Sequence, residues 1–185
     1  MKILPVAVFL AVSIAAAQAG PLPIPTSPGV YVVKMGHDQI ILGQPVTFKR
    51  TGSLLASHLT FGLKAAHGNI QLPGRHAQTV TGPNPEFFFI PSSREAANGI
   101  TAGDLILARL KMQGNRRQIE VGAEGAMRGS TGISITHQLE VVRTEPKPAT
   151  YELKPANTLK PGEYAFYLQR GEGLPPMLFD FSVQK

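Results

Sequence analysis

The sequence LKPGEYAF at residues 159–166 carries more fold information than any other stretch of this chain. Pro161 and Gly162 predict a tight turn, because proline fixes φ at the first central position of a turn and glycine accepts positive φ at the second. A strand follows directly, with Tyr164 as its first large side chain. The spacing from Leu159 predicts that the Tyr164 ring is buried and that its hydroxyl bonds to the preceding loop. All four residues are therefore expected to be structural.

The segment after this turn predicts a closing pair of strands. Large apolar side chains alternate along residues 163–169, which indicates one face turned to a core. A loop from Arg170 to Pro176 then leads to a final strand at residues 177–183. A tyrosine that bonds back to its loop at the start of the penultimate strand, the tyrosine corner, is typical of immunoglobulin-like sandwiches. We therefore expect immunoglobulin-like closing strands.

Short runs rich in β-branched and aromatic residues recur along the rest of the chain, separated by Gly, Pro or Asn. Alternating polarity with a turn signal about every ten residues is typical of antiparallel sandwiches and barrels. We predict an all-β fold, an antiparallel β-sandwich of two stacked sheets. One short helix is expected at residues 92–98, capped by Ser92 or Ser93 and ended by Gly99. The other strands are expected at residues 30–34, 39–42, 46–50, 58–64, 69–72, 86–90, 104–112, 116–121, 138–144 and 151–154.

The first nineteen residues have the pattern of a secretory signal peptide. A basic start precedes an apolar run at residues 3–17, and small residues at Ala17 and Ala19 fit a signal-peptidase site. The run is shorter than the roughly 20 residues that span a bilayer, although a retained membrane anchor is the alternative. Cleavage near Ala19 predicts an exported protein, periplasmic or extracellular, with no transmembrane segment in the mature form.

The expected domain organisation is simple. Residues 20–29 form a proline-rich arm, which is expected to be extended because proline disfavours helix. Residues 30–185 are predicted to be a single elaborated β-sandwich domain. Two smaller domains, joined at residues 91–103, are the alternative.

Composition excludes several kinds of site. The chain has no cysteine, which excludes disulfides, acyl-cysteine anchoring, iron–sulfur clusters, thiolate zinc sites and cysteine nucleophiles. Ser130 lies in a GSTG string that lacks the spacing of a nucleophile elbow. The 12 acidic residues are scattered singly, so no catalytic pair can be assigned. We therefore expect a non-enzymatic protein without a cofactor, and a hydrolase is kept only as a minor alternative.

Histidine and methionine offer the main alternative function. His58, His67 and His76 are evenly spaced, and His37 and His137 lie elsewhere. None belongs to a short ligand motif, so no metal site is predicted from them. The alternative is a periplasmic copper-type carrier that uses His and Met ligands. Its candidate ligands are Met35, His37, Met112 and Met127.

Basic residues mark the expected contact surface. The formal charge of the chain is +6, and its densest basic cluster is Arg109, Lys111, Arg116 and Arg117. A hairpin around Gly114 would bring these side chains near one tip, where they could meet an anionic surface such as lipid headgroups. The alternative is a charged hairpin edge that prevents pairing with other sheets. No aromatic residues are interleaved with them, so nucleic acid is not an expected partner. The residue 170–176 loop is a second expected contact region.

The C-terminal tail resembles the ends of small secreted bacterial β-sandwich proteins of uncharacterised function. The resemblance rests on PGEYAF followed by FDFSV, about thirty residues, and more faintly on the segment from Gly103 to Gly122. It implies a secreted β-sandwich and no particular activity. Together with the charge pattern, it predicts an exported binding or structural accessory protein of the cell envelope, whose partner is a protein or another envelope component.

Overall fold

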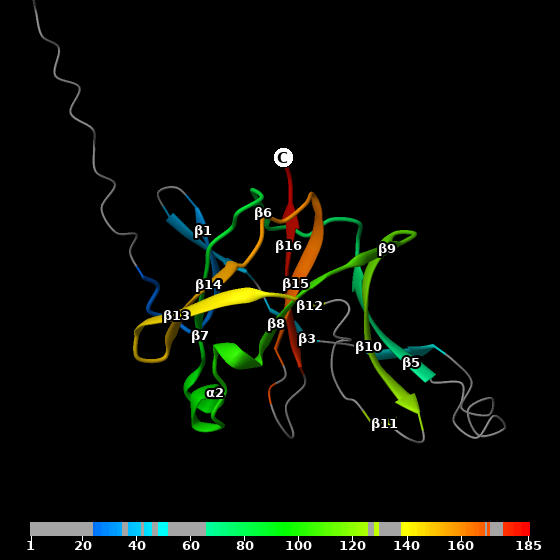
Figure 1. The fold of residues 1–185 in the computed structure, drawn as a ribbon, viewed down its shortest axis with the longest axis horizontal. Helices are drawn as coiled ribbons and strands as arrows, with labels where there is room; N and C mark the ends of the chain where they lie inside the picture. Colours follow the sequence, from blue (N-terminus) through cyan, green and yellow to red (C-terminus); the bar gives the residue numbers. More distant parts are fainter. Residues whose placement is uncertain are drawn as a thin grey trace, which may run out of the picture.

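The computed structural model describes residues 24–34, 37–41, 43–45, 48–51, 66–125, 128–129, 138–168, 170 and 176–185. Within these residues the fold is all-β, with strands in three stacked sheets and one short helix (Figure 1). The predicted all-β sandwich is confirmed. The predicted signal peptide and the strand expected at residues 58–64 lie outside the described residues.

The first outer sheet is antiparallel throughout and has the strand order β13-β14-β7-β1-β2. Three of its five strands, β1, β7 and β14, begin within one residue of the predicted positions, and β2 begins two residues earlier. The fifth, β13, is the second part of the strand expected at residues 138–144. The strands are β1 (Gly29–Lys34), β2 (His37–Ile41), β7 (Phe87–Ile90), β13 (Val141–Lys147) and β14 (Thr150–Pro155).

The middle sheet has the order β12-β8-β15-β16-β3, and a short strand β6 pairs in parallel with β16. The predicted closing strands β15 and β16 are its central antiparallel pair. The strands are β3 (Gln44–Pro45), β6 (Val80–Thr81), β8 (Leu105–Arg109), β12 (Gln138–Leu139), β15 (Gly162–Leu168) and β16 (Met177–Val183).

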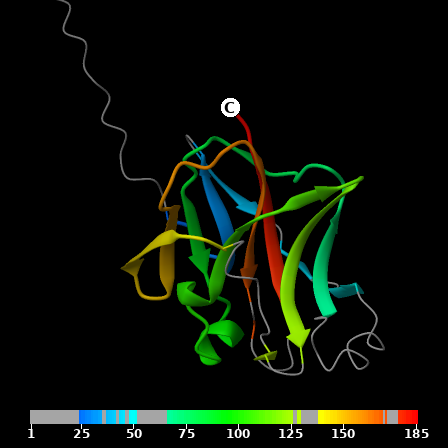
Figure 2. The ribbon, with the colours of Figure 1, turned by 45° about the vertical axis from the view of Figure 1, so that its right-hand side comes forward.

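The second outer sheet has the order β11-β10-β5-β4, with β9 paired to β10. Figure 2 shows this sheet on the opposite side of β16 from β1 and β7. The strands are β4 (Phe48–Thr51), β5 (Ala66–Pro73), β9 (Lys111–Gln113), β10 (Arg116–Gly125) and β11 (Arg128–Gly129).

Two separate cores explain why there are three sheets instead of the two expected. The large core lies between the first outer sheet and the middle sheet, and it includes Phe87, Phe166 and Phe181. The small core lies on the other face of the middle sheet, where Tyr167 and Leu178 pack against the second outer sheet. Because β15 and β16 bury large side chains on both faces, each face is covered by a sheet.

Two predicted strands are each divided between two sheets. The strand expected at residues 104–112 is β8 and β9, separated at Leu110, and it passes from the middle sheet to the second outer sheet. The strand expected at residues 138–144 is β12 and β13, separated at Glu140, and it passes to the first outer sheet. Sequence alternation does not reveal these crossings, since both halves remain extended.

The helix follows its sequence signals closely. Helix α2 (Ser93–Ala97) has Ser92 as its N-cap, and Ser92 and Glu95 form a reciprocal capping box. Gly99 ends the turn with φ of 74°, a conformation that favours glycine. A single 3-10 turn, Ala102–Asp104, then leads into β8. The predicted helix is thus confirmed with its cap and its stop.

A tyrosine bonds back to its own loop at two places. The Tyr164 hydroxyl donates to the Lys160 carbonyl oxygen at 2.7 Å, the kind of bond that its spacing predicts. The Tyr31 hydroxyl donates in the same way to the Ser27 carbonyl oxygen at 2.9 Å. The two sites share a Pro-Gly-x-Tyr sequence, KPGEY and SPGVY, which sequence analysis did not connect. The immunoglobulin-like character of the closing strands stays a prediction.

Candidate functional site: the β9–β10 hairpin and a buried charge cluster

The β9–β10 hairpin projects from the second outer sheet. Gly114 has φ of 60° at its turn, and the register places Arg116 opposite Gln113 and Arg117 opposite Met112. All residues from Lys111 to Arg116 are exposed, and Met112 is 46% exposed. Because neighbouring side chains alternate, Arg116 and Arg117 point to opposite faces of the hairpin.

The four predicted contact residues therefore have different environments. Lys111 and Arg116 are exposed, and the Arg116 Nη1 donates to Gln71 Oε1 at 3.1 Å. Arg109 is also exposed, at the end of β8. Arg117 is only 3% exposed, so its guanidinium is not available at the surface. The expectation of a contact surface thus needs correction for Arg117, whose strand turns it toward the small core.

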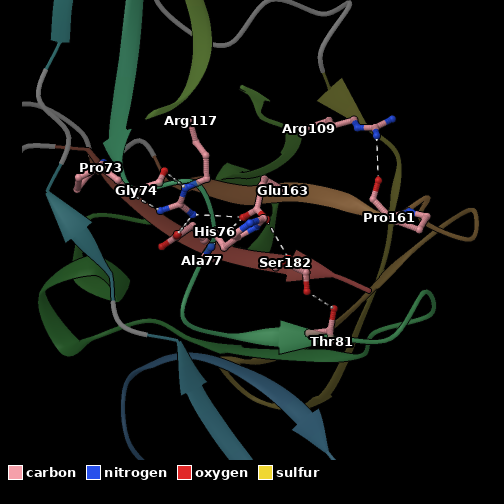
Figure 3. A network of polar contacts seen from close by, with 11 residues as sticks. Pro73, Gly74, His76, Ala77, Thr81, Arg109, Arg117, Pro161, Glu163 and Ser182 are labelled. Carbon is pink, nitrogen blue, oxygen red and sulfur yellow. Dashed lines mark hydrogen bonds and ion pairs between the residues drawn. The ribbon is translucent and has the colours of Figure 1, made fainter. Parts of the chain in front are cut away.

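Arg117 is the centre of a buried charge cluster between two sheets (Figure 3). Its Nη1 forms a short ion pair with Asp180 Oδ2 on β16 and lies 3.5 Å from Glu163 Oε2 on β15. Its Nε and Nη2 donate to the carbonyl oxygens of Gly74 and Pro73, at 3.2 and 3.0 Å. One guanidinium therefore joins β10, the middle sheet and the segment after β5.

Glu163 anchors the segment that follows β5. Its Oε2 accepts the Ala77 N–H at 2.8 Å, and its Oε1 accepts the Ser182 hydroxyl at 2.9 Å. The His76 Nδ1 lies 3.0 Å from the same Oε1, although the His76 side chain is 75% exposed. Buried charge is costly unless it is paired and hydrogen-bonded, and these contacts meet that requirement. The cluster therefore fastens the sheets and the 74–77 segment together.

Sequence reasoning missed this cluster, but one signal for it was present. Asp180 is the one charged residue of strand β16, on the face shared by Leu178, and a buried charge there needs a partner. Glu163 and Ser182 are cross-strand neighbours in the register of β15 and β16. The sequence does not indicate which arginine pairs with Asp180, because Arg116 and Arg117 are adjacent on one strand and only the structure shows that Arg117 is the buried one.

Arg109 has a structural contact that the sequence did not suggest. Its Nη2 donates to the Pro161 carbonyl oxygen at 3.0 Å, and its guanidinium carbon lies 5.8 Å from the centroid of the Tyr164 ring. A Cβ at Gly162 would lie 3.0 Å from Arg109 Nη2, so a larger residue at this turn would require the Arg109 side chain to shift. Burial raises the pKa of the Tyr164 phenol, while the nearby Arg109 charge and the bond to Lys160 oppose that shift.

The second expected contact region begins with an ion pair. Arg170 Nε lies 2.7 Å from Glu95 Oε1, so the first residue of the 170–176 loop is attached to helix α2. Residues 171–175 lie outside the described residues. The availability of this loop to a partner stays a prediction.

Two of the four candidate copper ligands lie outside the described part of the chain, and His37 begins β2. Met35, Met127, His58 and His137 are among the residues that are not described, and Met112 is at the exposed hairpin. In the described residues, no group of three or more His, Asp or Glu side chains is arranged to hold a metal ion. The copper-type carrier therefore stays an untested alternative.

Comparison with known proteins identified no relative. No family model, no curated protein and no solved structure matches this chain. Across the described ranges, none of the helices has the length and apolar character needed to span a bilayer.

Proposed function

We propose that this chain is an exported, non-enzymatic binding or structural accessory protein of a bacterial-type cell envelope, and that its β9–β10 hairpin contacts an anionic component of that envelope. The observation that carries the proposal is the continuous exposure of residues 111–116, with Lys111 and Arg116 on the same face. In Figure 2 the turn of this hairpin lies at the edge of the molecule.

Among the described residues, no carboxylate forms an ion pair with the exposed cations of the hairpin. Within the described part of the chain Lys111 has no ion pair within 4.0 Å, and Arg116 bonds to a neutral amide. Lys154, by contrast, is paired with both Glu86 and Glu152. Each unpaired cation near an anionic membrane contributes about 1 kcal/mol of attraction. The exposed Met112 adds an apolar side chain on the opposite face of the same hairpin.

The buried acidic groups support a role without catalysis. Glu163 and Asp180 contact Arg117, and Glu163 also accepts two further hydrogen bonds. Glu95 closes the capping box and pairs with Arg170. Each of these carboxylates is held by fixed contacts within the fold, which supports a structural role for it.

A vesicle assay tests the proposal. The protein is sedimented with vesicles that contain phosphatidylglycerol and, separately, with neutral phosphatidylcholine vesicles. We expect binding to the anionic vesicles only, and weaker binding as salt is raised. Replacing both cations, Lys111→Gln with Arg116→Gln, should weaken binding by about thirtyfold, since two contributions of about 1 kcal/mol are lost.

The matched control removes two exposed cations elsewhere. Arg94 on α2 and Lys147 on β13 are both exposed. The double variant Arg94→Gln with Lys147→Gln has the same net charge as the hairpin variant. Equal loss of binding in the two variants would assign the attraction to net charge and contradict a hairpin contact. Absence of binding to anionic vesicles would contradict the proposed partner.

A further inference from the structure

A recess of about 270 Å³ opens where three segments meet. It lies between the end of β8, the crossing from β12 to β13, and the loop from β14 to β15. Leu139, Pro155 and Leu159 give it an apolar wall, and Arg109, Lys160 and Glu140 bring charges of both signs. It is separate from the tip of the β9–β10 hairpin.

The walls of this recess are fixed by backbone and side-chain bonds. The Ala156 N–H donates to the Glu140 carbonyl oxygen at 2.9 Å, which ties the start of the β14–β15 loop to the crossing strand. The Leu159 N–H donates to the Pro83 carbonyl oxygen at 2.9 Å. The Tyr164 bond holds the Lys160 carbonyl. A site whose walls are already ordered loses less entropy when it binds a ligand.

The Arg109 guanidinium is held in place but keeps hydrogen-bond donors for a ligand. Its bond to Pro161 and its position over Tyr164 fix the guanidinium plane. A guanidinium has five N–H donors, and in the described residues only one Arg109 nitrogen has a protein acceptor. The remaining donors suit a carboxylate, which guanidinium binds well because of its planar fork.

The opposite charges of the recess do not pair with each other. Glu140 and Lys160 are both exposed, and across the described ranges neither has an ion-pair partner within 4.0 Å. Elsewhere on the surface, Lys154 and Glu152 lie close enough to pair at 3.0 Å. Opposite charges held apart around an apolar wall are complementary to a molecule that itself carries both charges.

We propose that this recess binds a small zwitterion of the size of an amino acid. Arg109 and Lys160 take its carboxylate, Glu140 takes its ammonium group, and Leu139 and Leu159 contact its apolar side chain. The volume is below the range of about 300–1,000 Å³ that drug-sized ligands occupy, which limits the ligand to a small molecule. This inference does not rest on the proposed envelope contact, since it uses none of residues 111–116.

Three probes with a common carbon skeleton test the requirement for both charges. They are L-leucine, 4-methylpentanoate, which lacks the ammonium group, and 3-methylbutylamine, which lacks the carboxylate. Protein expressed from the full chain is labelled with ¹⁵N and titrated by NMR. We expect saturable shifts of the Leu139 and Leu159 amide signals with leucine, and affinity about fivefold lower for each single-charge probe. Absence of saturable shifts with leucine would overturn the proposal.

Two conservative substitutions test which side chain contacts each charged group of the ligand. Glu140→Gln should weaken leucine binding about fivefold and leave 4-methylpentanoate binding unchanged, because only leucine offers an ammonium group. Lys160→Gln should weaken both of these probes. The matched controls are Glu145→Gln and Lys147→Gln, which change exposed residues near the far end of β13. Leucine affinity that is the same in the Glu140 and Lys160 variants as in the controls would overturn the assignment.

Discussion

Replacing Arg117 with methionine is the most direct test of how the second outer sheet is held. The substitution keeps a long side chain on β10 but removes the charge and all the guanidinium donors. Asp180 and Glu163, which are 5% and 6% exposed, then lose their buried cation. The carbonyl oxygens of Pro73 and Gly74 lose their side-chain donors as well.

The expected loss of stability is large. Removing one partner of a buried ion pair costs about 3–5 kcal/mol, because the remaining charge stays buried without compensation. Small domains unfold with a total free energy of about 5–15 kcal/mol. With a urea dependence of about 2 kcal/mol per molar, the unfolding midpoint should fall by about 2 M.

The chain offers a closely matched control in Arg116. It precedes Arg117 on the same strand, is exposed, and bonds only to Gln71 in the described residues. Arg116→Met should change the free energy of unfolding by no more than about 0.5 kcal/mol, as for most surface substitutions. Urea titration followed by circular dichroism measures both variants. Similar midpoints for Arg116→Met and Arg117→Met would refute the reasoning from the buried cluster.

Three further predictions concern other side chains. Tyr164→Phe removes the hydroxyl bond to Lys160 and should lower the free energy of unfolding by about 1 kcal/mol in thermal melts, whereas an unchanged midpoint would contradict a stabilising corner. Burial raises the pKa of the Tyr167 phenol, so its contribution to stability is complete below the ordinary value of 10.0 and is lost as pH rises through the raised value. Tyr167→Phe should therefore flatten the alkaline fall in stability, and an equally steep fall would count against this. The Lys154 bond lowers the pKa of Glu152, but Lys154 is 45% exposed, so Glu152→Gln should cost less than about 1 kcal/mol and nothing measurable in 1 M salt. A larger, salt-independent loss would show that this exposed pair contributes more than expected.

Local elements could be predicted because their signals are contained in a few neighbouring residues. The capping box of Ser92 and Glu95 and the stop at Gly99 define the helix without reference to the rest of the molecule. The tyrosine bond at Tyr164 depends likewise on five consecutive residues. The arrangement of the sheets depends instead on pairings between distant segments, such as β16 with β6, which alternation alone does not specify.

Whether a charged residue is buried likewise depends on distant segments that the local sequence does not specify. Alternation predicts that Arg116 and Arg117 lie on opposite faces of their strand, but it does not say which face is buried. That choice depends on Asp180 and Glu163, which come from strands far along the chain. Lys111 and Arg116 have the exposure that sequence analysis expected of a contact surface. The recess was missed because it combines residues from three separate segments.

The position of β15 and β16 in the sequence affects how a nascent chain can fold. These two strands, at residues 162–183, come after every described strand of the two outer sheets, yet both outer sheets pack against them. The ribosome releases the described strands of both outer sheets before β15 and β16. The inner faces of the outer sheets therefore stay uncovered until the middle sheet is complete. A polypeptide cut before residue 162 would therefore expose two apolar surfaces at once and become a target for chaperones and proteases.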